Sequence, residues 1–345
     1  MTINNKTATA LTNRVSVVIP TYNRADILRK TLQAYSEQDS YEQILEVLVV
    51  DDGSKDQTRS VVEESSRHSR VALRYLHQQN SGLAAARNHA IREARGDLML
   101  FGDDDIIPGG SMVSEHLAWH RKHPEPTVGV LGHVAWAPEV RATPFMEWAG
   151  LYGPQFQFGY FKPGTDLDFR HAYFCNTSLK SSFLKQHGRF DEDFHGYGWE
   201  DIEFSYRLYK EGWRLRYNPN AIGYHCKFET FDQTLRRMEQ VWWNSWPVYL
   251  KTESGRRFSD LLCAERVKPT GGEKKNIVRK RLGSLKRSAA PLLRSLMDSR
   301  LKLPDKVYDF VWYHYSKPIV DAGLCQQEEV ERDAASPNEK LTVRG

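Results

Sequence analysis

Over the first hundred residues, short apolar runs alternate with longer stretches of helical character. Residues 24–37 carry apolar side chains at helical spacing, and residues 83–95 form an alanine-rich helical stretch. The apolar runs are rich in β-branched and aliphatic residues, have the length of buried strands, and lie at residues 15–19, 45–50, 71–77 and 97–101. This alternation predicts an α/β fold with a mostly parallel central sheet and helices on both faces.

Three of the four predicted strands end in polar residues that suit a ligand. These ends are Thr21-Tyr22-Asn23-Arg24, Asp51-Asp52-Gly53-Ser54 and Asp103-Asp104-Asp105. Ligands of open parallel sheets bind outside the carboxyl ends of the strands. We therefore expect one site to gather all three segments.

The pattern becomes less regular in the second half of the chain. Residues 106–180 are rich in aromatic residues, glycine and proline, and residues 145–161 predict a loop-rich aromatic wall. Beyond them the pattern predicts one helix and two short strands, at residues 196–210, 214–217 and 221–224.

From about residue 255 the chain becomes basic. Between residues 268 and 302 there are eleven lysines and arginines and two acidic residues, whereas the whole 345-residue chain carries a net charge of +4. Apolar spacing predicts a basic amphipathic helix at residues 277–297, which Pro291 kinks or splits. Two interpretations are open: peripheral docking on an anionic membrane, or packing on the rest of the protein with a solvated basic face. No recognised motif supports nucleic-acid binding.

The composition is that of an ordinary globular protein, with 40% hydrophobic and 27% charged residues. No apolar run approaches the roughly 18 residues of a membrane-spanning helix. The N-terminus is polar, which argues against a cleaved secretory signal. The four cysteines are far apart in the sequence, so neither a zinc ribbon nor a disulfide scaffold is indicated. Together these features predict a cytoplasmic protein.

The three carboxylates at residues 103–105 are the strongest chemical signal in the chain. Carboxylates that follow a buried strand repel one another unless a cation compensates them, and Mg²⁺ or Mn²⁺ favours oxygen ligands shared with a diphosphate. A solvated acidic turn is the alternative for residues 103–105. For residues 51–54, the alternative to a ligand contact is an Asx turn. The chain has neither GxGxxG after the first strand nor GxxxxGK[ST], which excludes the dinucleotide and P-loop routes to phosphate binding.

Four motifs, in order, resemble those of family 2 glycosyltransferases. They are VSVVIPTYNR at 15–24, VVDDGS at 49–54, NSGLAAARN at 80–88 and FGDDD at 101–105. A second block, at residues 175–204, resembles the acceptor-side half of the galactosyltransferase-like and chondroitin-polymerase-like branch. The resemblance covers roughly residues 15–229. It implies the A-type, nucleotide-sugar-binding fold and an inverting enzyme.

The resemblance also implies roles on the nucleotide side of the site. Pro20 and Tyr22 would line the nucleobase pocket, with Tyr22 stacking on the base. Asp52 would accept a hydrogen bond from the base. Arg87 would lie near the nucleotide, where a cation suits a diphosphate.

The carboxylates of the fourth motif take the remaining donor roles in this family. Asp103 and Asp104 would contact the ribose or the donor sugar, and Asp105 would be the main protein ligand of Mn²⁺ or Mg²⁺. His225 lies where related enzymes place a histidine metal ligand. A hydrogen-bonded core histidine is the alternative for that residue.

Asp201 is the candidate base, which would deprotonate the acceptor hydroxyl as it attacks the anomeric carbon. Its place in the first turn of a helix favours the ionised carboxylate and lowers its base strength. Glu200 would bind sugar hydroxyls, although simple helix capping is the alternative for both acids. Trp199 is a candidate for stacking on a sugar ring, with a place in the core as the alternative.

These observations predict a metal-dependent inverting glycosyltransferase with a nucleotide-sugar donor, most simply a uridine diphosphate sugar. The acceptor would be a hydroxyl of a glycan or a lipid-linked saccharide. A sugar-nucleotide nucleotidyltransferase and a non-catalytic glycan-binding relative are the alternatives. The predicted parts are a flexible N-terminus, a catalytic domain, a basic helical extension and a disordered tail, at residues 1–14, 15–254, 255–325 and 326–345.

Overall fold

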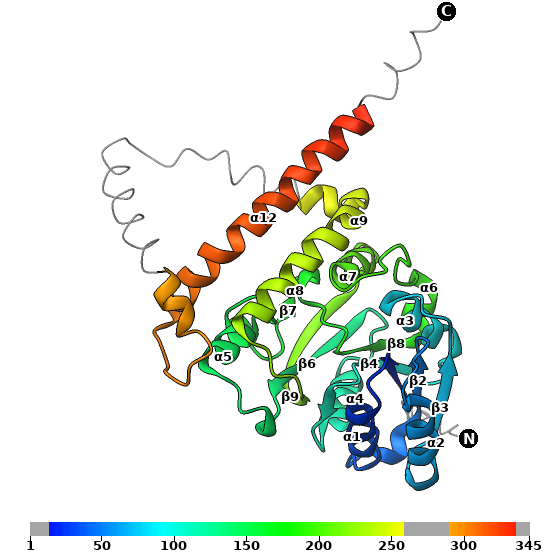
Figure 1. Cartoon of the computed structure of the whole chain (residues 1–345). Helices are drawn as coiled ribbons and strands as arrows, with labels where there is room; N and C mark the ends of the chain where they lie inside the picture. The colour runs from blue at the N-terminus through cyan, green and yellow to red at the C-terminus, as the bar shows by residue number, and fades with distance from the viewer. Residues whose placement is uncertain (1–13, 259–289, 336–345) are drawn as a thin grey trace, which may run out of the picture.

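Nine strands pair into one mixed sheet in the structure, a computed structural model that describes residues 14–258 and 290–335 (Figure 1). The order along the sheet is β3-β2-β1-β4-β8-β6-β9-β5, with β7 also paired to β9. The strands are β1 (Val15–Thr21), β2 (Ile44–Asp51), β3 (Leu73–His77), β4 (Leu98–Gly102), β5 (Ile106–Pro108), β6 (Val128–Trp136), β7 (Asp166–Leu167), β8 (Asn176–Lys180) and β9 (Arg214–His225).

The helices surround this sheet. They are α1 (Ala25–Ser36), α2 (Thr58–His68), α3 (Leu83–Glu93), α4 (Met112–Lys122), α5 (Pro144–Leu151), α6 (Ser181–His187), α7 (Glu200–Lys210), α8 (Phe231–Asn244), α9 (Trp246–Lys251) and α12 (Asp305–Ala335). Short 3₁₀ turns lie at Tyr41–Gln43, Pro138–Val140, Phe158–Tyr160 and Phe169–His171. The predicted α/β architecture is confirmed.

The first four strands have the parallel arrangement that the sequence predicts. β1 pairs in parallel with β2 on one side and with β4 on the other, and β3 adds to β2 in the same sense. Helices α1, α2 and α3 connect these strands, as parallel pairs require. Thr21, Asp51 and Gly102, the last residues of β1, β2 and β4, therefore lie along the same edge of the sheet.

The rest of the sheet is mixed and not mostly parallel. β8 runs antiparallel between β4 and β6, and β5 and β7 pair antiparallel with β9, whereas β6 and β9 are parallel. Asn176 opens β8 opposite Gly102, so the chain enters β8 at the edge where the motifs gather. β9 is one strand where two were predicted, because residues 219–221 bulge out of register and the pairing with β6 then resumes.

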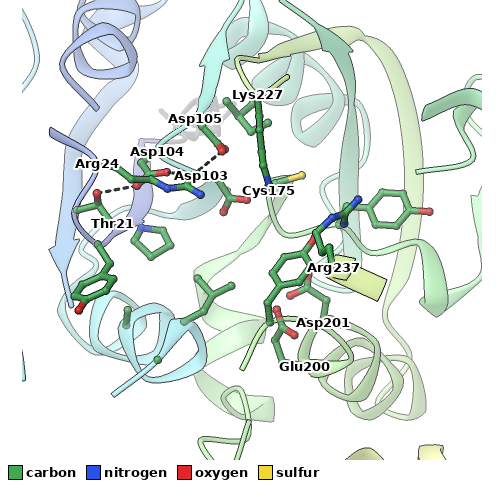
Figure 2. Close-up of a pocket in the computed structure, with 18 of the residues that line it drawn as sticks. Thr21, Arg24, Asp103, Asp104, Asp105, Cys175, Glu200, Asp201, Lys227 and Arg237 are labelled. Atoms are coloured by element: carbon green, nitrogen blue, oxygen red, sulfur yellow. Dashed lines mark hydrogen bonds and ion pairs between the residues drawn. The ribbon is translucent and has the colours of Figure 1, made fainter. Parts of the chain in front are cut away.

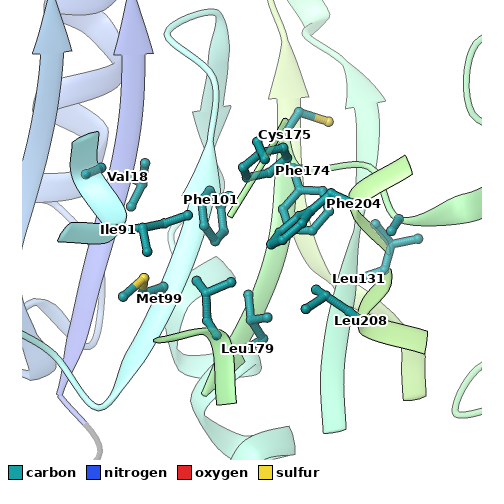
Figure 3. Close-up of a cluster of buried hydrophobic side chains, with 14 of the residues drawn as sticks. Val18, Ile91, Met99, Phe101, Leu131, Phe174, Cys175, Leu179, Phe204 and Leu208 are labelled. Atoms are coloured by element: carbon teal, nitrogen blue, oxygen red, sulfur yellow. The ribbon is translucent and has the colours of Figure 1, made fainter. Parts of the chain in front are cut away.

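Each face of the sheet has its own hydrophobic core. α3, α6 and α7 contribute to the first core, which includes Phe101 and Phe204 (Figure 3). α1, α2 and α4 contribute to the second. Along β1, Val18 belongs to the first core while Val17 and Ile19 belong to the second, as the alternation of a strand requires. The prediction of helices on both faces is confirmed.

The C-terminal helices pack against the rest of the protein. α12 lies beside α8 (Figure 1), and the two join α5 in a third core that includes Phe145, Trp148, Phe231, Tyr308 and Val311. Leu293 and Met297, from the end of the predicted amphipathic helix, also pack against this third core. Residues 277–289 of the predicted amphipathic helix lie outside the described residues, so docking on a membrane stays a prediction.

α12 continues to Ala335, ten residues into the segment that was predicted to be disordered. Residues 326–335 contain no glycine or proline and are rich in Glu, Gln and Ala, which favour a helix. Within the described parts of the chain, none of the helices is both long enough and apolar enough to cross a membrane.

The packing of α12 can be tested with two tyrosines of that helix. Tyr308 is buried and stacks on Trp148 at 5.8 Å between ring centroids, whereas Tyr313 is 63% exposed. Tyr308→Ala should lower the free energy of unfolding by about 3 kcal/mol because it leaves a cavity in the third core. Urea denaturation measures the loss. Tyr313→Ala is the matched control, with an expected loss below about 0.5 kcal/mol; equal small losses in both variants would contradict the packing.

Candidate active site

The ends of β1, β2 and β4 face the first turn of α7 across a cavity of about 590 Å³. Figure 2 shows the carboxylates of residues 103–105 on one side of this cavity and Glu200 and Asp201 on another. Eleven site residues were predicted from the sequence, and ten of them line the cavity: Pro20, Tyr22, Asp52, Arg87, Asp103, Asp104, Asp105, Glu200, Asp201 and His225. The fold therefore brings the separate motifs into one site.

Thr21, Arg24 and His225 lie against two of the three consecutive carboxylates, Asp104 and Asp105. Thr21 Oγ1 donates to Asp104 Oδ2 at 2.8 Å. Arg24 Nη1 donates to Asp104 Oδ1 at 3.0 Å and to Asp105 Oδ2 at 2.6 Å. His225 Nε2 lies 3.6 Å from the same Asp105 oxygen. The partners come from β1, from the turn after it and from β9, so three parts of the sheet converge on these acids.

The three carboxylates differ in how readily they ionise. Burial raises the pKa of Asp103 to about 7 and that of Asp104 to about 6. Burial also disfavours ionised Asp105, but His225 and Arg24 outweigh it and lower the pKa of Asp105 to about 2. Asp105 therefore stays ionised throughout the physiological pH range, as a metal ligand must.

His225 is the second candidate metal ligand. Its Nδ1 is buried without a hydrogen-bond partner, and its ring stacks on Trp136 at 5.2 Å between centroids. The 3.6 Å between His225 Nε2 and Asp105 Oδ2 can be spanned by two bonds of about 2.1 Å to a common ion. No three His, Cys, Asp or Glu side chains converge on one point within residues 14–258 and 290–335. The pair fits a divalent cation whose other ligands are substrate oxygens and water.

Asp52, which is predicted to bind the nucleobase, is held in place by three hydrogen bonds. Its Oδ1 accepts hydrogen bonds from Gln78 Nε2 at 2.8 Å and from Ser81 N at 2.9 Å, and its Oδ2 accepts one from Gly82 N at 2.9 Å. A carboxylate offers about four acceptor positions, so one remains for a ligand. Tyr22 is 44% exposed at the rim of the cavity, where a flat ring is accessible for stacking.

Arg87, predicted to lie near the nucleotide, is a buried residue of the cavity wall. It is only 2% exposed, and its Nη1 donates to Asp201 Oδ1 at 2.6 Å. Its Nη2 donates to Asp103 Oδ1 at 3.4 Å, and its Nη1 lies 3.6 Å from Glu200 Oε1. One guanidinium thus joins carboxylates from both sides of the cavity. In this geometry Arg87 fixes the position of the Asp201 carboxylate.

An unusual turn places the two acids of α7. Gly198 and Trp199 precede the helix with φ angles of 100° and 69°, both in the left-handed region. A side chain at Gly198 would be strained by this φ and would also collide with Val241, since a Cβ there would lie 2.7 Å from Val241 Cγ1. The turn brings Asp201 into the cavity, where its Oδ2 accepts a hydrogen bond from the backbone N–H of Phe174 at 3.1 Å.

Burial is the largest influence on how these two acids ionise. Burial raises the pKa of Asp201, although Arg87 and the Phe174 N–H act in the opposite direction. Burial and then the charge of Asp201 raise the pKa of Glu200 well above its ordinary value. The net pKa of Asp201 is therefore raised, and the opposing contribution of the helix N-terminus stays a prediction.

Trp199 is the predicted site residue that does not line the cavity. Its ring stacks on Tyr249 at 4.7 Å between centroids and packs against Trp246 and Trp242 in an aromatic cluster. Trp199 therefore has a place in the core, which was the alternative to stacking on a sugar ring. Tyr197, two positions earlier, lines the cavity and is 55% exposed.

Four further charged residues line the cavity and were not assigned to it from the sequence: Arg24, Lys227, Glu229 and Arg237. Arg24 belongs to the motif at residues 15–24, so its place at the end of a strand was an available signal. Lys227 follows β9, and its Nζ lies 3.3 Å from Glu229 Oε1. Arg237 on α8 donates to both carboxylate oxygens of Glu229, at 3.1 and 2.8 Å. No local pattern indicated Arg237, because its helix was not linked to the site by any motif.

The role of Arg87 can be tested through stability. Arg87→Met should lower the free energy of unfolding at pH 7 by about 3 kcal/mol, because buried carboxylates lose their cation. The pKa values of Glu200 and Asp201 are raised in the folded protein, so protonation favours folding and stability falls as pH rises. Loss of Arg87 strengthens this dependence. The deficit should shrink as the pH is lowered from 7 to 5, measured by urea denaturation.

Arg92→Met is the matched control on the same helix. Arg92 has a 44% exposed side chain and lies 4.0 Å from Glu192. Its replacement should cost less than about 0.5 kcal/mol at either pH. A deficit in Arg87→Met that does not change with pH would contradict the positioning role.

Residues 16–181 match the family model described as glycosyl transferase family 2. The validoxylamine A glucosyltransferase of Streptomyces hygroscopicus subsp. jinggangensis (strain 5008) is 36% identical over 245 residues. The match covers 64% of this chain and 57% of that protein, so the chain spans little more than half the length of this relative.

Two solved structures share the fold. A mannosyltransferase from Pyrobaculum calidifontis in complex with GDP-Man and Mn²⁺ superposes with a TM-score of 0.52 at 18% identity, over 86% of this chain and 85% of that one. Residues 1–349 of S. aureus TarS in complex with UDP-GlcNAc give a TM-score of 0.51 at 19% identity, over 93% and 92%. Residues 16–181 therefore resemble a glycosyl transferase family 2 domain, and the chain has the A-type glycosyltransferase fold of these two structures.

Proposed function

We propose that this chain is a metal-dependent, inverting glycosyltransferase that moves one sugar from a nucleotide-sugar donor to a hydroxyl of a glycan or lipid-linked saccharide. One observation carries the proposal: Arg87 spans Asp103 on the donor side, at 3.4 Å, and Asp201 on the acceptor side, at 2.6 Å. A donor site and a base that share one guanidinium are close enough to act on the same anomeric carbon.

The donor would enter with its nucleobase between Pro20, Tyr22 and the free acceptor position of Asp52. The solved relatives of this fold were determined with GDP-Man in one case and UDP-GlcNAc in another, so the fold accommodates either base. We favour a uridine diphosphate sugar, the donor class in the TarS complex. Asp103 and Asp104 would contact the ribose or the donor sugar.

Asp105 and His225 would hold Mn²⁺ or Mg²⁺. When bound, the ion would act as a Lewis acid and stabilise the negative charge on the departing nucleoside diphosphate. The manganese in the Pyrobaculum calidifontis complex supports this part of the proposal.

Asp201 would act as the base. Its carboxylate would take the proton of the acceptor hydroxyl while that oxygen bonds to the anomeric carbon and the bond from this carbon to the phosphate oxygen breaks. Attack from the face opposite the diphosphate inverts the anomeric configuration. The raised pKa strengthens the base, and Arg87 with the Phe174 N–H holds both of its oxygens in place.

Glu200 would bind a sugar hydroxyl. The residue is 2% exposed, and its Oε2 is buried without a hydrogen-bond partner. A buried acceptor of this kind costs free energy until a ligand satisfies it. A hydroxyl of the donor or acceptor sugar is the ligand that this cavity would offer.

Asp201→Asn tests the base assignment. Removal of a general base should lower the transfer rate by about 10²- to 10⁴-fold. The dissociation constant of the nucleoside diphosphate with Mn²⁺ should stay within about threefold, because the donor side is unchanged. Transfer is followed as nucleotide release from the donor that the wild type uses best, and binding by calorimetry. The matched control is Glu211→Gln, which replaces an exposed acid just after α7 and should leave the transfer rate and the dissociation constant unchanged. Wild-type transfer by Asp201→Asn would refute the assignment.

Asp105→Asn tests the metal assignment. The variant should bind the nucleoside diphosphate at least about tenfold more weakly in the presence of Mn²⁺, because the amide is a poorer ligand than the carboxylate. Calorimetric titrations with Mn²⁺ and with a chelator measure the difference. Asp97→Asn, just before the opposite end of β4, is the matched control. If manganese enhances binding equally in the wild type and in Asp105→Asn, other ligands hold the ion.

A further inference from the structure

Arg24 lies in the wall between two hollows. The active-site cavity and a neighbouring hollow of about 510 Å³ at the start of α1 are both lined by Arg24, Asp105 and Lys227. The second hollow is also lined by Asp26 and Asp56. The guanidinium therefore has space on both sides of its present position, and carboxylates line each side.

One nitrogen of Arg24 makes both of its hydrogen bonds to the neighbouring acids. Nη1 donates to Asp104 Oδ1 at 3.0 Å and to Asp105 Oδ2 at 2.6 Å (Figure 2). The Arg24 side chain is 44% exposed, whereas those of Asp104 and Asp105 are 6% and 12% exposed. The acids are fixed and the arginine is the accessible partner, so it is the member of the cluster that can move at least cost.

Arg24 and the proposed metal ion need the same atom. Asp105 Oδ2 accepts from Arg24 Nη1 at 2.6 Å and also faces His225 Nε2 at 3.6 Å. A cation bound to this oxygen would lie against the positive guanidinium, in a site with little solvent to screen the repulsion. The two positive charges cannot both occupy this position.

We propose that Arg24 is a displaceable counter-ion that competes with the divalent cation for Asp105 and, when displaced, pairs with the donor diphosphate. This inference rests on the proposed function. A guanidinium suits the oxygens of a phosphate, so the nucleotide supplies the partner that Arg24 loses when the ion binds. Nucleotide and metal ion then bind with positive coupling, and the ion alone binds weakly.

The test is a Mn²⁺ titration of the full chain without nucleotide, with the free ion measured by electron paramagnetic resonance. Arg24→Gln should bind Mn²⁺ at least about tenfold more tightly than the wild type, because the competing charge is gone. Arg24→Lys keeps the charge and should stay within about threefold of the wild type. Arg29→Gln on α1, whose partner is the exposed Glu64 at 2.6 Å, is the matched control and should not differ.

A second measurement uses the wild type alone and does not depend on any variant folding. Uridine or guanosine diphosphate should tighten Mn²⁺ binding at least about tenfold, and by linkage Mn²⁺ should tighten nucleotide binding by the same factor. In Arg24→Gln this coupling should be smaller, because the ion alone already binds well.

The outcomes separate this inference from the proposed function. If the wild type binds Mn²⁺ with nucleotide but Arg24→Gln binds the ion alone no more tightly, the counter-ion role is wrong and the proposed function stands. If the wild type shows no coupling between ion and nucleotide, the counter-ion role is also wrong. If the folded wild type binds no Mn²⁺ with either nucleotide, the metal-dependent function fails and this inference fails with it.

Discussion

The burial of Arg87 among carboxylates from two parts of the fold is the interaction on which the site depends. Its guanidinium contacts Asp103 at the end of β4 and Asp201 at the start of α7. The next residue, Asn88, donates to Phe190 O at 2.8 Å and accepts from Phe190 N at 2.9 Å. Two neighbours on α3 therefore fix both the acids and the loop that leads to α7. The distance between Asp103 and Asp201 therefore follows from the position of one helix.

The charge balance of the cavity follows from this arrangement. Three consecutive carboxylates and two more on α7 would repel one another, and the fold places cations against each group. Burial keeps the pKa values of Asp103 and Asp104 raised, while Arg24 and His225 lower that of Asp105. A divalent ion and a diphosphate entering this cavity would exchange partners with charges that are already present, which is less costly than creating a new charged site.

Local patterns predicted the parallel strands and the acids at their ends, because a buried strand and the residues that follow it are adjacent in the sequence. They did not predict the pairing of Arg87 with Asp201, which lie 114 positions apart and meet only through the packing of α3 and α7. The sequence around Trp199 was equally compatible with stacking on a sugar ring and with packing in the core. Only the positions of α8 and α9 place this residue in an aromatic cluster. The antiparallel entry of β8 likewise depends on long-range pairing and has no local signature.

In the proposed reaction, one base and one donor site lie on opposite sides of the transferred sugar. Proton nuclear magnetic resonance of the product, recorded during the first turnovers with an α-linked nucleotide sugar, shows which face of the sugar is attacked. A single inverting step gives a β-linked product with a large coupling between the anomeric proton and its neighbour for a glucose-type sugar. An α-linked product would require a second displacement or a different attacking face, and would contradict the assignment of Asp201 as the base of a single inverting step.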